Sequence, residues 1–220
     1  MSLSHSEEAE DATGFVLAGG QSSRMGRDKA LLEISGEPLI ARALTALREA
    51  GLQPAIAGAR SSLSDFAPVI EDSTAMGPLS GICAALSATT ARYGVFLPVD
   101  LPFIPPSLIA YMLLHARLTE SLITVAAAGG SPQTFPAVVE RQALHFFEGQ
   151  LRTEERGCLH SFRCAAKYLG GRFSILQTEL LVQAGQVSHA ASLPPALWFF
   201  NLNSPQDLTR AQKAGMGFFE

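Results

Sequence analysis

The sequence predicts an α/β fold built on a largely parallel central sheet. Short apolar runs alternate along the chain with longer segments of helical periodicity, a pattern typical of βαβ units. The 220 residues are 47% apolar and 16% charged, which suits one globular domain with a sizeable core. We therefore expect a single domain over residues 14–220. Residues 1–13 are polar and acidic, and we expect them to form a disordered leader.

Hydrophobic periodicity locates the individual elements. Strands are expected at 14–18, 54–58, 67–71, 93–98, 121–127, 134–139, 172–177 and 197–201. Helices are expected at 38–50, 79–90, 105–117, 140–150, 158–168 and 204–214. The strands 121–127 and 134–139, joined through Gly129 and Gly130, are expected to form an antiparallel pair at the sheet edge. Residues 178–196 have weak periodicity and receive no assignment.

Local signals mark several helix ends. Pro106 stands near a predicted helix start, where its missing N–H costs little. Ser204, Pro205 and Asp207 have the pattern of an N-cap, a proline at the first helical position and an acid in the first turn. Gly51 stands where a helix-ending residue belongs. These signals support the predicted boundaries.

Composition excludes several classes of partner and compartment. The formal net charge of −4 argues against a general nucleic-acid or anionic-membrane surface. No apolar run approaches the ~20 residues of a membrane-spanning helix, and the N-terminus lacks the regions of a signal peptide. The three cysteines, Cys83, Cys158 and Cys164, fit a reducing cytoplasm, where we expect the protein. The segment from Cys158 through His160 to Cys164 matches no structural zinc pattern, so we interpret these thiols as incidental.

The most informative segment is the loop that follows the first predicted strand. Gly19 and Gly20 end that strand and permit a close backbone approach to a ligand, as in anion-binding loops. Arg24 and Lys29 bring positive charge to the same loop. The spacing matches neither a Walker A loop nor the dinucleotide fingerprint. We interpret the loop as a polyphosphate site, most simply for a nucleoside triphosphate; the alternative is an ordinary turn with solvated basic residues.

Two further predicted strands end in polar residues. Asp100 follows the buried run that begins at Val95, and ligands of open α/β sheets bind at the carboxyl ends of strands. A single carboxylate beside phosphates is a natural Mg²⁺ ligand, whereas the alternative is a cap for the helix near Pro105. Asp72 ends another run, and Gly77 then opens a helix whose N-terminus can attract an anion. Equally, Asp72 can be a solvated acid and Gly77 part of a simple turn.

The last apolar run precedes Asn201 and Asn203. Either side-chain carbonyl can complete a metal or phosphate shell, although Asn203 can equally be a turn residue before the Ser204 cap. No nucleophile elbow or catalytic triad is present, and the histidines are scattered. The implied chemistry is therefore positioning and electrostatics, as in phosphoryl transfer.

Taken in order, these segments resemble the molybdenum cofactor guanylyltransferase family, a group of MobA-like nucleotidyltransferases. The motifs are L-A-G-G-x-S-x-R-M-G-x-D-K, E-D with G-P-L-x-G, P-x-D-x-P-F and F-x-N-x-N-x-P-x-D-L, and they run from Leu17 to Leu208. The resemblance implies a Rossmann-like nucleotidyltransferase fold, with a mostly parallel sheet, helices on both faces and a small antiparallel element. It also implies transfer of GMP from GTP to Mo-molybdopterin, with Mg²⁺ as cofactor and pyrophosphate as the second product.

Matching positions carry the expected roles to this chain. Leu17, Ala18 and Gly19 would line the nucleotide, Lys29 would hold its phosphates with help from Arg24, and Asp72 would contact GTP. Asp100 would bind both GTP and Mg²⁺, and Asn201 and Asn203 would lie near the metal and the pterin phosphate. Gly20 and Gly77 complete the nucleotide-binding set that the loops predict. Arg24, Lys29 and Asp100 are the expected catalytic residues.

Some features depart from the family pattern or leave alternatives open. Many members carry Asn in the loop that reads Ala57 to Arg60 here, and many have an additional proline in the segment that reads Gln133 to Ala137. Related cytidylyltransferases carry Ala where this chain has Gly19, so Gly19 favours a purine nucleotide. The alternatives are a relative that uses CTP or another phosphorylated acceptor, and a non-catalytic nucleotide- or cofactor-binding chaperone. Expected partners are the two substrates and proteins that deliver molybdopterin or accept the cofactor.

Overall fold

The computed structural model describes residues 11–19, 28–58, 61–72, 77–152 and 157–215. In this part of the chain a seven-stranded sheet has the order β5-β4-β1-β6-β8-β7-β9. Its strands are β1 (Ala12–Leu17), β4 (Gln53–Ala57), β5 (Val69–Ile70), β6 (Tyr93–Pro98), β7 (Ser121–Ala128), β8 (Ser131–Glu140) and β9 (Arg172–Gln177). Among these described strands β8 alone runs antiparallel to its neighbours, so the mostly parallel sheet is confirmed.

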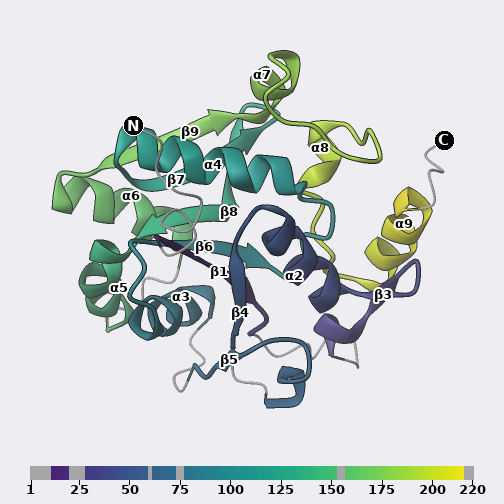
Figure 1. Ribbon diagram of the computed structural model, residues 1–220, viewed down its shortest axis with the longest axis horizontal. Helices are drawn as coiled ribbons and strands as arrows, with labels where there is room; N and C mark the ends of the chain where they lie inside the picture. The colour runs from purple at the N-terminus through teal and green to yellow at the C-terminus, as the bar shows by residue number, and fades with distance from the viewer. Residues whose placement is uncertain (1–10, 20–27, 59–60, 73–76, 153–156, 216–220) are drawn as a thin grey trace.

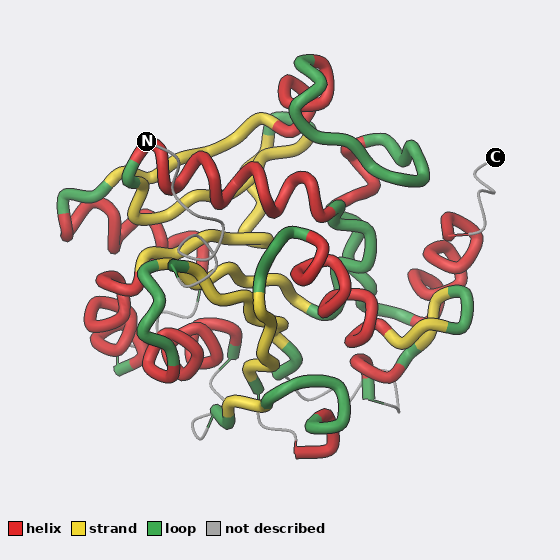
Figure 2. The backbone as a smooth tube through the Cα atoms, viewed as in Figure 1, coloured by secondary structure: helices red, strands yellow, loops and turns green. Residues whose placement is uncertain are grey.

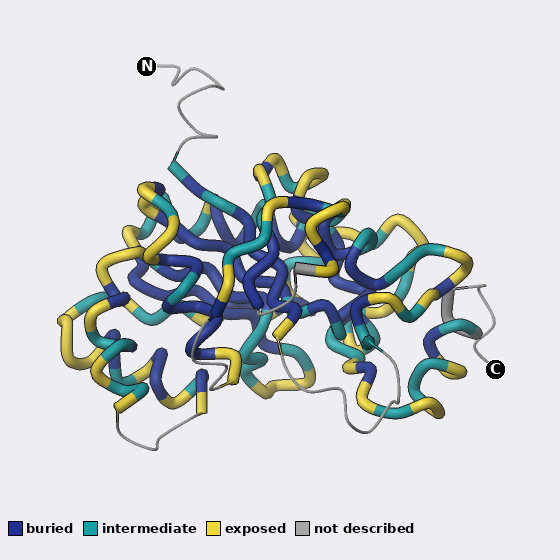
Figure 3. The backbone as a smooth tube through the Cα atoms, turned by 90° about the horizontal axis from the view of Figure 1, so that it is seen from below, coloured by how far each residue is buried: buried dark blue, intermediate teal, exposed yellow. Residues whose placement is uncertain are grey.

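Helices cover both faces of the sheet, as predicted (Figures 1 and 2). On one face lie α2 (Leu39–Glu49) and α4 (Pro106–Thr119), and on the other lie α3 (Pro78–Ala88), α5 (Leu144–Leu151) and α6 (Cys158–Leu169). Successive strand side chains point to opposite faces, so Val16 joins the core under α2 and α4 while Phe15 joins the core under α3. Figure 3 shows the strands as the buried layer between these helices.

Short elements complete the described chain. A two-stranded antiparallel sheet joins β2 (Glu33–Ile34) and β3 (Glu37–Pro38), and it lies beside α9 (Pro205–Gly215). The remaining elements are η1 (Lys29–Leu31), η2 (Ser61–Leu63), η3 (Arg141–Ala143), α7 (Thr178–Gln183) and α8 (Pro195–Trp198). Within the described residues, no helix combines the length and the apolar character that crossing a membrane requires.

The order of the strands places a switch point at the carboxyl ends of β1 and β6. The chain runs from β1 outward to β4 and β5, then returns to pair β6 with the other side of β1. Helices that follow β1 and β5 therefore pack on opposite faces, and the carboxyl ends of β1 and β6 are left open between them. Ligands of doubly wound sheets bind at such a switch point. Both Leu17 and Asp100 belong to this edge.

Most predicted boundaries agree with the structure to within a few residues, including the helix end at Gly51, which has φ +84°. Strand β1 begins at Ala12, so it reaches two residues into the segment predicted as a leader. Residues 1–10 of that segment lie outside the described residues.

The predicted strand at 197–201 is wrong. This segment contains the end of α8, then a turn and irregular backbone. Pro195 occupies the first helical position, and the Trp198 indole is buried, donating from Nε1 to the Leu193 carbonyl (2.7 Å). The run is apolar because it packs on the core, and a short apolar run has the same pattern in a buried turn as in a strand.

The predicted placement of the 121–127 and 134–139 pair is also wrong. The two segments do pair antiparallel, as β7 and β8, but they lie inside the sheet. The other side of β8 pairs with β6, and β9 pairs with the other side of β7. Local sequence specifies the hairpin, whereas its neighbours come from segments distant along the chain.

Replacing Phe96 with Ala should lower the free energy of unfolding by about 3–5 kcal/mol, the usual cost of removing a buried aromatic ring. The Phe96 ring is fully buried and stacks on Phe15, with ring centroids 5.3 Å apart. Urea unfolding followed by circular dichroism measures the change. Leu118→Ala is the control: its side chain is 76% exposed, so its loss should change stability by less than about 0.5 kcal/mol.

Candidate active site at the carboxyl edge of the sheet

Backbone hydrogen bonds fix the start of the glycine loop. The Leu17 carbonyl accepts from Val99 N (3.1 Å), and Ala18 N donates to the Ala57 carbonyl (3.0 Å). The chain therefore leaves β1 between its two neighbouring strands, and Gly19 stands exposed just beyond them. The predicted site residues Gly20 and Arg24 lie outside the described residues.

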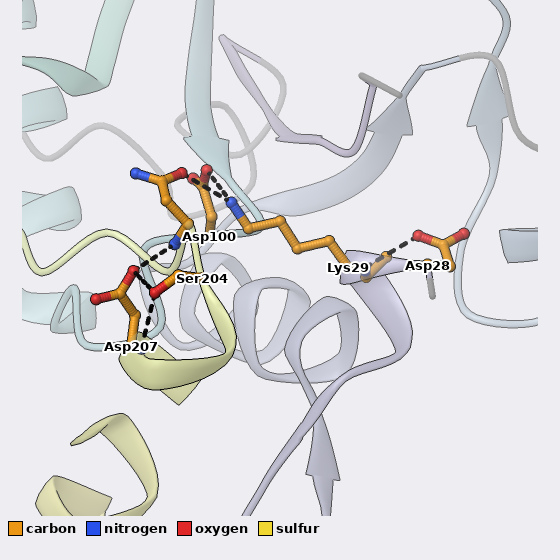
Figure 4. A network of polar contacts seen from close by, with 7 residues as sticks. Asp28, Lys29, Asp100, Ser204 and Asp207 are labelled. Carbon is orange, nitrogen blue, oxygen red and sulfur yellow. Dashed lines mark hydrogen bonds and ion pairs between the residues drawn. The ribbon is translucent and has the colours of Figure 1, made fainter. Parts of the chain in front are cut away.

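Lys29 begins a short helical turn that points its side chain into the site. Asp28 caps this turn, because its Oδ1 accepts from Ala30 N (3.1 Å), and Ala30 is buried in the core. From that anchored backbone the Lys29 side chain extends to Asp100, with Nζ 2.8 Å from Oδ2 (Figure 4). Lys29 Nζ also donates to Asn203 Oδ1 at 3.2 Å. The fold thus brings together three predicted site residues from separate parts of the sequence: Lys29, Asp100 and Asn203.

The Asp100 side chain belongs to this cluster and does not cap α4. The residue that caps α4 is Pro105, so the alternative of a helix cap is excluded. The Asp100 backbone is held on two sides, since Leu101 N donates to the Pro98 carbonyl (3.2 Å) and Leu202 N donates to the Asp100 carbonyl (3.0 Å). The second bond brings the segment of Asn203 alongside β6.

The first turn of α9 fixes Asn203. Asp207 Oδ2 accepts from Asn203 N (3.1 Å) and from Ser204 Oγ (2.8 Å), while Asp207 N donates to Ser204 Oγ (3.2 Å). Asn203 therefore precedes the helix cap, as one of its two predicted interpretations requires, and its side chain contacts Lys29. The hydrogen bond from Ser204, followed by that from Asn203 N, lowers the pKa of Asp207. Asn201 is exposed two residues earlier.

Asp72 belongs to a second group on the other side of β1. It is buried just after β5, where Ser80 Oγ of α3 contacts its Oδ2 (2.5 Å) and the Gly77 carbonyl (2.7 Å). Gly77 has φ +100° and caps α3, and an added Cβ at Gly81 would lie 3.5 Å from Leu17 Cδ2. The N-terminus of α3 therefore lies beside the end of β1. The site consists of two groups that flank the start of the glycine loop.

Sequence reasoning missed two supporting residues, Asp28 and Ser80. Asp28 is the acid directly before the first helical residue, so the general N-cap preference could have identified it. Ser80 lies eight residues from Asp72, and only the packing of α3 brings the two together. No local signal identifies such a contact.

Two of the three thiols are buried. Burial raises the pKa of Cys83 to about 12 and that of Cys158 to about 11, so both thiols remain protonated at neutral pH. Cys164 lies 3.3 Å from His160 Nε2 at the surface of α6. Among the residues that the structure describes, no cluster of three or more His, Cys, Asp or Glu side chains could hold a metal.

The donor set around Lys29 nevertheless fits one kind of metal. Asp100 Oδ2 and Asn203 Oδ1 are both hard oxygen atoms, and they already converge on a cation. Mg²⁺ commonly binds through one or two carboxylates, with the remaining positions taken by water and substrate phosphates. A single carboxylate is therefore sufficient when a polyphosphate is present.

Known proteins resemble this chain over most of its length. A family described as the MobA-like NTP transferase domain matches residues 14–169. A molybdenum cofactor guanylyltransferase of Rhizobium leguminosarum bv. trifolii is 33% identical over 209 residues, covering 92% of each chain. The protein of the same name from Vibrio cholerae is 31% identical over 208 residues, again covering 92% of each chain.

A solved structure shows the same fold. Molybdopterin-guanine dinucleotide biosynthesis protein A of Archaeoglobus fulgidus superposes with a TM-score of 0.74 at 20% identity. The match covers 94% of this chain and all of the other. The nucleotidyltransferase fold implied by the motifs is therefore confirmed.

The pKa of Asp207 should rise toward its ordinary value of 3.8 when Ser204 is replaced with Ala, because the Ser204 hydroxyl is the main cause of its depression. Because the pKa of Asp207 is lower in the folded state, its ionised carboxylate stabilises the fold at neutral pH. This contribution is lost as the pH falls through the folded-state pKa. Carboxyl ¹³C NMR titration measures the midpoint. Thr209→Ala removes a hydroxyl that donates to the Pro205 carbonyl on the same helix, and it should leave the midpoint unchanged.

Proposed function

Because the chain belongs to the MobA-like NTP transferase family, we propose that it transfers GMP from GTP to Mo-molybdopterin, releasing pyrophosphate. The observation that carries the proposal is the 2.8 Å contact of Lys29 Nζ with Asp100 Oδ2 at the open end of β1 and β6. The Lys29 ammonium and the Asp100 carboxylate, the proposed metal ligand, thus lie near the start of the glycine loop at the switch point of the sheet. Phosphoryl transfer depends on positive charge and a metal-binding carboxylate beside the phosphates, and ligands of such sheets bind at the switch point.

The reaction requires positioning more than proton transfer. A terminal phosphate oxygen of the acceptor attacks the α-phosphorus of GTP, the new O–P bond forms, and the bond to the β-phosphate oxygen breaks. The attacking oxygen is already anionic near neutral pH, so no general base is needed. Lys29 stabilises the charge that develops on the leaving pyrophosphate, a preorganised electrostatic contribution. Arg24 is assigned the same role from the sequence.

Asp100 and Asn203 are the residues that would hold Mg²⁺. When bound there, the ion supplies charge neutralisation on the phosphates. The Asp100 backbone is held by its bond to Leu202 and the Asn203 backbone by its bond to Asp207, so both backbones are in place before substrate arrives. Ligands carried on an ordered backbone need less reorganisation on binding.

The group around Asp72 suits the nucleoside. A carboxylate accepts hydrogen bonds only, so Asp72 matches the N–H and O–H donors of guanosine. On this proposal the base binds near Asp72 and the phosphates near Lys29, with Leu17 at the end of the strand between the two groups. Gly77 adds the N-terminus of α3 on the Asp72 side.

Packing within the described residues does not require a glycine at Gly19. Among these residues, an added Cβ would meet Gly58 Cα at 3.8 Å, an ordinary contact. The backbone is also outside the left-handed region at this position. The missing side chain therefore leaves room for a ligand, and a purine is the larger of the two base classes.

Asp100→Asn should keep the fold and reduce turnover by roughly 100-fold or more, the scale expected when one electrostatic group is lost from an active site. Pyrophosphate release with GTP, Mo-molybdopterin and Mg²⁺ measures the rate. Asp65→Asn, an exposed site in the loop before β5, controls for the loss of one negative charge. Full activity of Asp100→Asn with Mg²⁺ as the only metal contradicts the assignment, as does absence of pyrophosphate release from the native protein.

Gly19→Ala should retain the native melting temperature but bind GTP about 10-fold or more weakly, since one methyl group in a tight pocket is worth that much. A ligand that binds only the folded state raises the melting temperature, so thermal shifts with GTP, ATP, CTP and UTP report binding. We expect the native protein to respond selectively to GTP. Gly149→Ala, where an added Cβ has open space, should respond as the native protein does. A CTP-selective shift favours the cytidylyl alternative.

A further inference from the structure

The Lys29 ammonium contacts both side-chain oxygens that the proposed function assigns to Mg²⁺. Its Nζ lies 2.8 Å from Asp100 Oδ2 and 3.2 Å from Asn203 Oδ1, the two oxygens that fit Mg²⁺. These partners are 71 and 174 residues away along the chain, so the fold itself assembles the three groups. Figure 4 shows the side chain of Lys29 extended from η1 toward Asp100. The fold therefore places one positive charge beside both oxygens.

The backbones that carry the two oxygens are hydrogen-bonded in place, whereas the ammonium can move. The backbone of Lys29 is anchored by the Asp28 cap and by the bond from Leu32 N to the Lys29 carbonyl (3.2 Å). Beyond that anchor the ammonium sits on a flexible four-carbon stem, which can redirect it while the backbone stays in place. Its side chain is 19% exposed and that of Asp100 is 22% exposed, so solvent reaches the pair. An exchange of cations at this point therefore requires no change of fold.

We propose that Lys29 acts as a built-in substitute for the divalent cation, so that the metal binds well only after nucleotide phosphates have drawn the ammonium away. An ammonium and a divalent cation repel each other and compete for the same oxygens, which weakens metal binding to the free protein. A polyphosphate attracts the ammonium and releases Asp100 Oδ2 for the metal. The nucleotide part of this exchange rests on the proposed function; the competition between Lys29 and the metal does not.

Thermodynamic linkage gives the proposal a second consequence. If nucleotide increases the affinity for metal, metal must increase the affinity for nucleotide by the same factor. The Lys29 side chain has two positions, one against Asp100 and one against the phosphates. Nucleotide and metal both favour the second position. Removing its charge should therefore strengthen metal binding in the absence of nucleotide, although the same change weakens nucleotide binding.

The test measures Mn²⁺ binding by electron paramagnetic resonance, with the full-length protein free of nucleotide. Mn²⁺ shares the preference of Mg²⁺ for oxygen ligands. Lys29→Met should bind Mn²⁺ about 5- to 150-fold more tightly than the native protein, the usual span of a coupling between two ligands. Lys167→Met removes a charge from the exposed surface of α6 and should bind Mn²⁺ as the native protein does. Equal or weaker Mn²⁺ binding by Lys29→Met overturns the proposal.

Two further variants identify the site and guard against misfolding. Adding Asp100→Asn to Lys29→Met should abolish the gain, whereas a gain that persists places the Mn²⁺ elsewhere and overturns the proposal. Lys29→Gln, which keeps a polar end, provides the same comparison if Lys29→Met unfolds by circular dichroism. With GTP present, the affinity of the native protein for Mn²⁺ should rise by more than that of Lys29→Met, and equal increases contradict the exchange.

The outcomes for the proposed function and for this inference are distinguishable. Tighter Mn²⁺ binding by nucleotide-free Lys29→Met supports the competition even if the native protein releases no pyrophosphate from GTP. Conversely, active GMP transfer together with unchanged Mn²⁺ affinity in Lys29→Met retains the enzyme and overturns the exchange.

Discussion

The parallel pairing of β1 with β4 on one side and with β6 on the other determines where the site can form. Since the chain leaves β1 in one direction across the sheet and later returns in the other, its helices diverge from the carboxyl end of β1. Gly19 lies exposed at that end of the strand. Asp100 comes to that end from the neighbouring strand, and the segment after α8 joins it through the bond between Leu202 N and the Asp100 carbonyl. Each functional side chain therefore depends on this one crossing.

The sequence predicts those parts of the site that rest on local chemistry. A carboxylate at the end of a buried strand, as at Asp100, and a hydroxyl before a proline-initiated helix, as at Ser204, are both signals confined to a few residues. The contact of Lys29 with Asn203 spans 174 residues, and its existence depends on how α9 packs beside β2. Local patterns could nominate both residues but could not show that they meet.

The two errors in the fold have the same physical origin. The run that contains Trp198 is apolar because its side chains are buried, and burial alone does not distinguish a strand from a turn packed on the core. The sequence of the β7–β8 hairpin predicts no further neighbour, so it indicates an edge position. In the structure β9, more than 40 residues away along the chain, pairs with β7. The conformation of the Trp198 run and the neighbours of the hairpin both depend on tertiary packing. Tertiary packing depends on the whole sequence and cannot be inferred from a local segment.

Two glycines near the site illustrate how a structural requirement can be separated from a functional one. Gly77 has φ +100°, a backbone conformation that side chains rarely adopt, so its identity follows from the turn into α3. Gly19 has neither a positive φ nor a close neighbour, so packing within the described chain does not explain it. A glycine without a structural cause at the open edge of a sheet is best explained by what must approach it from outside.

The limited strength of the Lys29–Asp100 pair is itself part of how such a site can work. Ion pairs that solvent reaches contribute about 0.2–1 kcal/mol, because water screens the charges and two long side chains lose freedom. A deeply buried pair would hold its partners much more firmly, since breaking it leaves an unpaired charge in a medium of low polarity. With both side chains about one-fifth exposed, this pair lies nearer the first case. Polyphosphate binding can therefore separate the two residues at small cost, while the anchored backbones on either side keep the oxygen ligands in place.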